Sequence, residues 1–348
     1  MTESNHQPTL SKEQIDSVIK LYSNGQYQEA IDQIKALNEI HPNVPFLFNL
    51  IGACYKAIGQ LKGAVKMFET AVSMKPEYAE AHKNLGITLR DLGQMDEALK
   101  SLNQAISAEP NYVDAHYNLA IILKDLNHFD DAVQSYYKVI EIDPNFAQAH
   151  NNLGNLLKEL SRNEDALKSY EKAIEVNPNF AQAHNNLGNA FKDLENYKDA
   201  IKYYEKAIEI NPNFSEAHNN LGNVFKDLGE LDKAVNSYQK AIKLNSNFAE
   251  AYYNLGNTYK KLNRKQKALV FFEKAGAINP NMDFILGDIL TTRMQFCDWT
   301  DYSILLEGLQ SKIIDNEKVV DPFNLLGLID DPSLQKIAAQ IFSNYQCS

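Results

Sequence analysis

The sequence has few cysteines and no long apolar runs. Its three cysteines, Cys54, Cys297 and Cys347, stand far apart and form no CxxC pair, so they indicate neither a disulfide framework nor a zinc site. No stretch reaches the roughly 18 apolar residues of a membrane helix, and the first residues lack the basic and then apolar pattern of a signal peptide. We therefore expect a cytoplasmic protein that does not bind membranes.

Basic residues are scarcer than acidic ones, which gives a formal net charge of −11 at pH 7. A surface that binds nucleic acid needs clustered Lys and Arg to meet the phosphates. We expect no such cluster and no nucleic-acid partner, because an acidic surface favours solubility and basic partners instead.

Motifs for catalysis and cofactor binding are missing as well. The sequence contains no GxGxxG, Walker-type loop, GxSxG or HExxH segment. Carboxylates are plentiful but dispersed, and an open surface does not desolvate an acid–base pair. We expect no catalytic residue, no cofactor and no bound metal in these 348 residues.

What the sequence has in abundance is internal repetition, with the 34-residue period of the tetratricopeptide repeat. Within each period a proline, a small residue and a large apolar residue recur, and an alanine stands four positions before the large residue, which is helical spacing. The prolines are Pro42, Pro76, Pro110, Pro144, Pro178, Pro212 and Pro280. The small residues are Gly52, Gly86, Ala120, Gly154, Gly188, Gly222 and Gly256, and the large ones are Phe68, Leu102, Tyr136, Tyr170, Tyr204, Tyr238 and Phe272.

Each repeat is expected to form two helices, A and B, joined by a tight turn. In the clearest copy helix A covers 147–160 and helix B covers 163–176, and the proline that follows ends helix B because it lacks an N–H and its ring clashes with the preceding turn. Three asparagines stand just after such prolines and are expected to cap the next helix A: Asn145, Asn179 and Asn213. We place the eight repeats at 11–44, 45–78, 79–112, 113–146, 147–180, 181–214, 215–248 and 249–282.

One hairpin cannot bury its own apolar stripe, so stacked neighbours must form a continuous core. We therefore predict an all-α fold: a tetratricopeptide-repeat α-solenoid, wound as a right-handed superhelix with a concave face. The resemblance to tetratricopeptide repeat proteins implies that the A helices line this concave face. Residues 1–10 are expected to be disordered, residues 283–295 to form a capping helix, and residues 296–348 to form a helical linker.

Asparagine recurs on helix A, where it costs helix propensity, and we expect it to add nothing to the core. The first column is Asn84, Asn118, Asn152, Asn186, Asn220 and Asn254, and the second is Asn155, Asn189, Asn223 and Asn257. A carboxamide can pair with both halves of a peptide group, so these columns predict a ladder that holds an extended polypeptide by its backbone. Duplication of one unit is the competing explanation, although it accounts less well for Asn84 and Asn118, whose surroundings have diverged.

Histidine also recurs on the same period, at His82, His116, His150, His184 and His218. Stacked helices lie about 8–10 Å apart, whereas histidines that share zinc must each place a nitrogen about 2.0–2.1 Å from the metal. We therefore expect partly buried structural imidazoles and no metal site.

The segment after the last repeat contains the sequence's only tryptophan, in the stretch Phe296-Cys-Asp-Trp-Thr-Asp-Tyr302. Together with the repeats, this stretch resembles the junction in O-linked N-acetylglucosamine transferases, and residues 321–326 and 330–335 resemble the linker of the bacterial-type members. The resemblance implies that the ladder holds the protein substrate, while a following catalytic region, missing from these residues, transfers N-acetylglucosamine from UDP-N-acetylglucosamine to Ser or Thr. It also implies that Trp299 packs the end of the array.

Two functions from different classes follow. The chain is expected to be the substrate-selecting arm of a protein O-N-acetylglucosaminyltransferase-like protein, with extended segments of other proteins as partners and a glycosyltransferase region in cis. The alternative is a stand-alone adaptor for protein assembly without sugar chemistry. A clamp for C-terminal carboxylates would need Lys and Arg where asparagine stands. Self-association as a homodimer is left open by the sequence.

Overall fold

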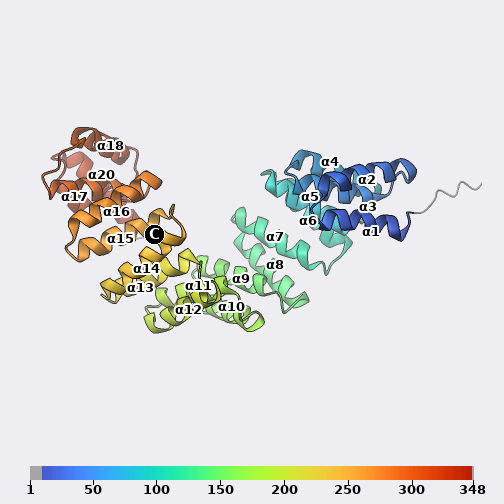
Figure 1. Ribbon diagram of the computed structural model, residues 1–348, viewed down its shortest axis with the longest axis horizontal. Helices are drawn as coiled ribbons and strands as arrows, with labels where there is room; N and C mark the ends of the chain where they lie inside the picture. Colours follow the sequence, from blue (N-terminus) through green and yellow to red (C-terminus); the bar gives the residue numbers. More distant parts are fainter. Residues whose placement is uncertain (1–9, 347–348) are drawn as a thin grey trace, which may run out of the picture. The chain divides into compact units, whose positions relative to one another are not determined.

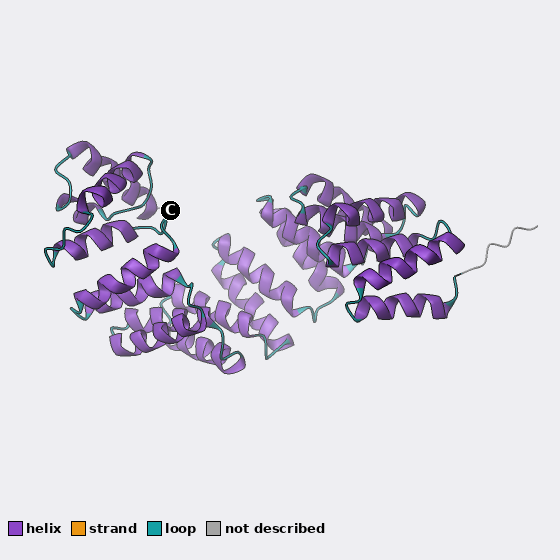
Figure 2. Ribbon diagram, turned by 45° about the horizontal axis from the view of Figure 1, so that its top comes forward, coloured by secondary structure: helices purple, strands orange, loops and turns teal. Residues whose placement is uncertain are grey.

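The computed structural model describes residues 10–346, and every regular element in this part of the chain is a helix (Figures 1 and 2). The chain divides into two compact units, residues 1–177 and 178–348. The disorder expected for residues 1–10 falls, except at Leu10, outside the described residues, as does Cys347. No helix within residues 10–346 is long and apolar enough to cross a bilayer.

The first unit consists of five consecutive helical hairpins in which the odd-numbered helix is helix A and the even-numbered one is helix B (Figure 1). Its helices are α1 Lys12–Ser23, α2 Tyr27–Ile40, α3 Pro45–Ala57, α4 Leu61–Met74, α5 Ala79–Asp91, α6 Met95–Ala108, α7 Val113–Asp125, α8 Phe129–Ile142, α9 Ala147–Glu159 and α10 Asn163–Val176. Each B helix from α2 to α8 packs on the A helix that follows it, which makes the core of this unit continuous.

The second unit contains three further hairpins and a C-terminal segment of four helices. The hairpin helices are α11 Ala181–Asp193, α12 Tyr197–Ile210, α13 Ser215–Asp227, α14 Leu231–Leu244, α15 Ala249–Lys261 and α16 Lys265–Ile278. The C-terminal segment contains α17 Ile285–Met294, α18 Tyr302–Ile314, α19 Pro322–Leu326 and α20 Pro332–Gln346. α17 packs on α16 in the place that the helix A of a further repeat would take.

The recurring small residue and the recurring large residue form the centre of each hairpin. A Cβ built on Gly154 would lie 2.6 Å from the ring of Tyr170, and one on Gly222 would lie 2.7 Å from the ring of Tyr238. Both tyrosines are buried to within 1% of their surface. Glycine therefore stands on helix A because a side chain there would displace the aromatic ring of helix B.

The turn between helices A and B places one residue in the left-handed region of φ. Glycine fills this position in four hairpins, for example at Gly93, whereas Ser161 and Glu195 adopt it with φ of 59° and 55°. Glycine has no Cβ and takes this conformation without strain, while other residues are disfavoured there. The fold therefore stores mild backbone strain at the turns that lack glycine.

The predicted N-cap at Asn145 is wrong by one residue. The N-cap of α9 is Phe146, which makes no side-chain cap bond, and the backbone N–H of Asn145 donates instead to a carboxylate oxygen of Asp143 at 3.0 Å. Asn213 likewise donates to the side chain of Asn211 at 3.1 Å. These asparagines belong to the turn after helix B, because the proline places them before the helix begins.

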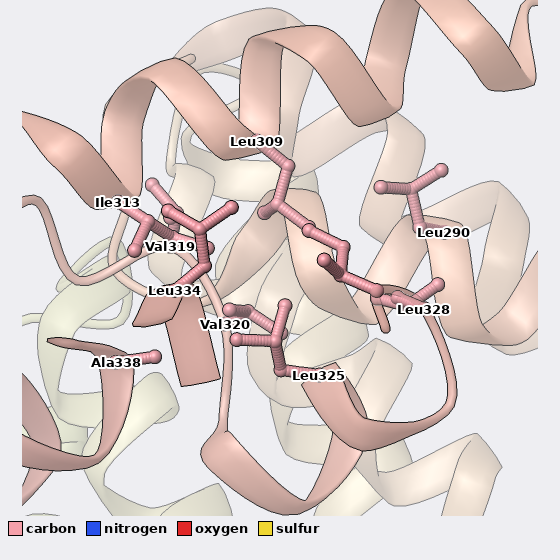
Figure 3. Close-up of a cluster of buried hydrophobic side chains, with 10 residues drawn as sticks. Leu290, Leu309, Ile313, Val319, Val320, Leu325, Leu328, Leu334 and Ala338 are labelled. Carbon is pink, nitrogen blue, oxygen red and sulfur yellow. The ribbon is translucent and has the colours of Figure 1, made fainter. Parts of the chain in front are cut away.

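The C-terminal segment encloses a core of its own, made of aliphatic side chains (Figure 3). Leu309 and Ile313 of α18 and Leu325 of α19 are fully buried in it. Trp299, by contrast, is 55% exposed and contacts only Tyr302 among the aromatic rings of the described chain, edge to face at 5.1 Å. The expectation that Trp299 packs the end of the array is therefore wrong.

Candidate functional site

The first asparagine column, called the ladder below, consists of Asn84, Asn118 and Asn152 in the first unit and Asn186, Asn220 and Asn254 in the second. All six lie in A helices, at the same position of successive hairpins. Most side chains of the ladder are half-buried, and those of Asn186 and Asn254 are 8% exposed. The ladder residues are thus mostly shielded from solvent but not deep in the core of the hairpins.

In the first unit the ladder links neighbouring A helices. The Nδ2 of Asn84 donates to Oδ1 of Asn49 in the preceding A helix at 3.0 Å, and the Nδ2 of Asn152 donates to the hydroxyl of Tyr117 at 2.8 Å. Asn118 instead donates to the main-chain oxygen of Asp114 in its own helix at 2.7 Å. Two of these three rungs therefore bridge consecutive repeats.

The same link recurs in the second unit. Asn220 donates to Oδ1 of Asn185 at 3.1 Å, and Asn254 donates to Oδ1 of Asn219 at 3.2 Å. Each bond joins residues 35 apart, one helix A to the next. The expectation that these asparagines add nothing to packing is therefore wrong, since a bond of this kind contributes about 0.5–1.5 kcal/mol to stability.

An aspartate occupies the corresponding place beyond the last ladder residue. Asp288 of α17 is 7% exposed, and its carboxylate accepts hydrogen bonds from the hydroxyl of Tyr253 and from Nζ of Lys260, each at 2.9 Å. Burial raises the pKa of Tyr253, and the nearby Asp288 carboxylate raises it further. The 34-residue spacing of the ladder thus continues into α17, where an aspartate in an ion pair with Lys260 takes the place of asparagine.

The second column pairs with the buried tyrosines of helix B. The hydroxyls of Tyr170, Tyr204 and Tyr238 donate to the side-chain oxygens of residues 155, 189 and 223 at 2.8, 2.7 and 2.8 Å. Burial raises the pKa values of Tyr204 and Tyr238. A buried hydroxyl needs such a partner. These asparagines therefore stabilise the core of each hairpin by accepting the hydrogen bond of its buried tyrosine.

The fourth member of the second column has no such tyrosine, because its hairpin carries Phe272 at that place. The side chain of Asn257 instead hydrogen-bonds the hydroxyl of Tyr253 and so lowers the pKa of that tyrosine, against the larger effect of burial. All four members of this column are partly exposed on the A helices.

The ladder keeps hydrogen-bonding capacity after these internal bonds are counted. A primary carboxamide has two N–H donors and an oxygen with two lone pairs. The bonds from Asn84, Asn152 and Asn220 each use one donor hydrogen, and Oδ1 of Asn152 also accepts a hydrogen bond from Nδ2 of Asn151 at 3.3 Å. The oxygen and the second hydrogen of the same group have the chemistry to pair with the N–H and C=O of an extended backbone.

The recurring histidines lie at the junction of each helix B with the next helix A. Nε2 lies within hydrogen-bonding distance of a proline carbonyl oxygen six residues earlier, at 2.8 Å for His82, 2.9 Å for His116 and 3.0 Å for His150 and His184. A carbonyl oxygen only accepts, so Nε2 carries the proton. Burial lowers the pKa of His184 and of His218.

The other ring nitrogen is enclosed in part of the column. Nδ1 of His82 and of His184 is buried with no hydrogen-bond partner among residues 10–346. A second proton would therefore enter a place without an acceptor. Within the same described range, no three His, Cys, Asp or Glu side chains gather as metal ligands.

One feature of the sequence contradicts the expectation that basic residues are not clustered. Between residues 260 and 267 stand five basic residues and no acidic one. They flank the turn between α15 and α16. The negative net charge of the whole chain does not reveal this cluster. Counting basic and acidic residues in a short window along the sequence would have found it.

Comparison with family models gives matches along most of the hairpins. Models described as "TPR repeat" match residues 88–127, 154–195 and 222–263. Models described as "Tetratricopeptide repeat" match residues 113–146, 181–214 and 249–282, and also 55–104, 135–168 and 203–236. Together the matched ranges run from 55 to 282 without a gap.

Solved structures resemble the chain in fold. The APC/C hetero-tetramer Cut9–Hcn1 matches with a TM-score of 0.57 at 17% identity, over 83% of this chain and 57% of that one. A tetratricopeptide repeat protein from Parabacteroides merdae also gives 0.57, at 20% identity over 71% of this chain and 98% of that one. At this identity the likeness concerns the fold alone.

A curated relative matches a short part of the sequence. Anaphase-promoting complex subunit 3 of Dictyostelium discoideum is 35% identical over 65 residues. The match covers 19% of this chain and 7% of that protein.

Proposed function

Because this chain belongs to the tetratricopeptide repeat proteins, with repeats matched over residues 55–282, we propose that it is a protein-binding scaffold. Its A helices hold extended segments of other polypeptides. The ladder carboxamides bind the backbone of these segments, three rungs in each unit, with the second column beside them.

The observation that supports this proposal is that the ladder asparagines recur at the same position of consecutive A helices, with most of their side chains half-buried. The internal bonds of Asn84, Asn152 and Asn220 fix their carboxamides in place. Fixed groups lose less conformational freedom when a ligand binds. Each bond to a peptide group contributes only about 0.5–1.5 kcal/mol, so recognition is broad and weak unless several rungs are occupied together.

The first experiment replaces three rungs, as Asn152→Ala/Asn186→Ala/Asn220→Ala, in the full chain. Fluorescence anisotropy then measures the affinity for an unstructured peptide and for the same peptide with a scrambled sequence. We expect the unaltered chain to bind both peptides with about equal affinity. The variant should bind each of them at least about tenfold more weakly.

This variant also loses two inter-repeat bonds, those to Tyr117 and Asn185, so a stability control is needed. Tyr170→Phe/Tyr204→Phe/Tyr238→Phe removes three buried hydrogen bonds of the hairpins but leaves every ladder carboxamide. We expect it to melt at a lower temperature and to bind the peptides as before. Equal loss of binding in both variants would show that the ladder is structural only.

We further propose that the scaffold is the substrate-selecting arm of a protein O-N-acetylglucosaminyltransferase-like protein. The support is the stretch from Phe296 to Tyr302 directly after the repeats, together with apolar side chains that the C-terminal segment leaves uncovered. Phe323 is 82% exposed and Leu326 is 60% exposed, and such neighbouring apolar groups favour coverage by another folded region.

Translation of the coding DNA beyond the codon for Ser348 tests this second proposal. A frame that continues for a few hundred residues with an α/β pattern supports the transferase arm. A stop codon there contradicts a catalytic region in cis and leaves the alternative, a stand-alone adaptor that assembles other proteins.

A further inference from the structure

The turn between α15 and α16 carries a surface whose charge opposes that of the chain. Lys261, Arg264 and Lys267 are exposed and Lys265 is partly exposed. Within residues 10–346 no carboxylate lies at ion-pair distance from these four side chains, whereas Lys260 is paired with Asp288. Four unneutralised cations thus stand together on a molecule with a net charge of −11.

The equivalent helix ends in most of the other hairpins carry acidic residues. Six of the seven other B helices have an acidic residue in their first turn, and α16 has none. Acidic groups stabilise the positive end of a helix and basic groups destabilise it. The basic residues at α16 therefore oppose local stability, which favours a role outside the fold.

An aromatic ring from another segment stands beside these cations. Phe296, which follows α17, is 39% exposed, and its backbone N–H is fixed by the carbonyl of Arg293 at 2.9 Å. Together with the side chains of residues 263–267 it lines an open hollow of about 360 Å³. The ring gives the hollow an apolar wall, and the cations give it a positive rim.

We propose that this basic hollow, lined by residues 263–267 and Phe296, docks an acidic polypeptide segment that carries an apolar side chain. The carboxylates of the segment pair with Arg264, Lys265 and Lys267, and its apolar side chain lies against Phe296. The site uses no ladder carboxamide. A polypeptide fits better than nucleic acid because the rest of the chain is acidic and repels an extended row of phosphates.

The test titrates the full chain against a labelled Glu- and Asp-rich peptide with one central Phe, followed by fluorescence anisotropy. The same peptide with Gln and Asn in place of its acids is the first comparison, and an equally charged single-stranded oligonucleotide is the second. Above the weak, sequence-independent binding expected of the ladder, we expect additional affinity for the acidic peptide only, and this additional affinity should fall as salt rises.

The decisive variant is Arg264→Glu/Lys265→Glu/Lys267→Glu. Acidic residues are favourable at this helix end, so folding is preserved, and we expect affinity for the acidic peptide to fall about tenfold or more. Lys62→Glu/Lys66→Glu, which reverses two exposed lysines of α4, adds four of the six negative charge units of the triple variant. It controls for most of the change in net charge and should leave affinity within about twofold.

Phe296→Ala examines the apolar wall. It is expected to weaken binding of the peptide with Phe and to leave a version with Gly at that place unchanged. The proposal is overturned if the uncharged peptide binds equally well, if the α4 variant weakens binding as much as the α16 variant, or if the oligonucleotide binds more tightly than the peptide. The ladder variant serves as a separate control, since it should keep the difference in affinity between the acidic and the uncharged peptide even where its affinity for both is lower.

Discussion

The hairpins and the C-terminal segment differ in where their most prominent aromatic residues lie. In the hairpins the rings of Tyr170, Tyr204 and Tyr238 are buried against glycine on helix A. In the segment from residue 283 to 346 the core is aliphatic, and Trp299 and Phe323 are 55% and 82% exposed. These tyrosines therefore stabilise the repeats from within, while Trp299 and Phe323 remain available at the surface.

The difference shows which kind of packing a periodic sequence encodes. The rings of Tyr170, Tyr204 and Tyr238 each meet a glycine 16 positions earlier in the chain, so a change at either position affects one local pair. The aliphatic core of the segment joins side chains from four helices, α17 to α20, and from the loops on both sides of α19, for example Leu290, Leu309 and Val320 (Figure 3). Four predictions test this contrast.

The largest effect is expected where a hairpin ring is removed. Tyr204→Ala leaves a cavity beside Gly188 and should lower the free energy of unfolding by about 3–5 kcal/mol. Trp299→Ala, the matched change in the C-terminal segment, should alter it by about 0.5 kcal/mol or less because the ring is mostly exposed. Amide hydrogen exchange in α11 and α12 measures the destabilisation by Tyr204→Ala, and exchange in α17 and α18 measures that by Trp299→Ala. Equal losses at the two sites would remove the contrast.

A smaller but still large effect is expected in the aliphatic core. Leu309→Ala should destabilise the C-terminal segment by about 2–5 kcal/mol, since Leu309 is fully buried. Protection of the amides in α18 to α20 should fall in hydrogen exchange, while that in α11 to α14 stays the same. Loss of protection throughout the second unit would show instead that segment and hairpins unfold together.

Acid should weaken the hairpins through their histidines. The pKa values of His184 and His218 are lowered in the fold by burial, so the unfolded chain takes up protons first as pH falls. Their contribution to stability is present above the ordinary histidine pKa of 6.5 and is lost as pH falls below it. The segment after residue 282 contains no histidine.

Thermal melting at pH 7.5 and at pH 5.5 checks this expectation, with His184→Gln/His218→Gln as the comparison. The variant should show a smaller fall in melting temperature between the two pH values than the unaltered chain. A larger or equal fall would mean that carboxylates, and not these histidines, govern the acid response.

The smallest effect is expected at the turns. Glu195→Gly should stabilise its hairpin by about 0.5–1 kcal/mol, because glycine takes the positive φ of 55° without strain, although it also gains freedom in the unfolded chain. Chemical denaturation measures the shift. Gly93→Ala, the reverse change at the same place of another hairpin, should destabilise, and a gain there would contradict the account of the turns.

Much of the fold could be predicted from residue types at fixed spacing. The sequence indicated helix B at 163–176, which is the extent of α10, and helix A at 147–160, one residue longer than α9. Local rules suffice here, since the pair formed by Gly154 and Tyr170 lies within one hairpin. The predicted N-cap at Asn145 was wrong because this residue belongs to a backbone turn, and the helix begins one residue later than its side-chain type indicates.

The candidate site was predicted less completely. The sequence identified the asparagine columns but not the bond of Asn220 to Asn185, because contacts between residues 35 apart depend on how the hairpins stack. It also did not predict the hydrogen bond from Tyr204 to Asn189, because the sequence pattern explained the tyrosine as a core residue and the asparagine as a peptide-binding one. The exposure of Trp299 was missed because a single large aromatic residue usually packs, and only the tertiary structure shows that aliphatic side chains have filled the core.

The most direct test of the central claim follows the side-chain amide signals of asparagine by NMR while an unstructured peptide is added to the full chain. The account predicts that the signals of Asn84, Asn118, Asn152, Asn186, Asn220 and Asn254 shift together and saturate at the same peptide concentration, for the scrambled peptide as well. Shifts confined to the B helices or to the C-terminal segment, with the ladder signals unchanged at saturation, would contradict it.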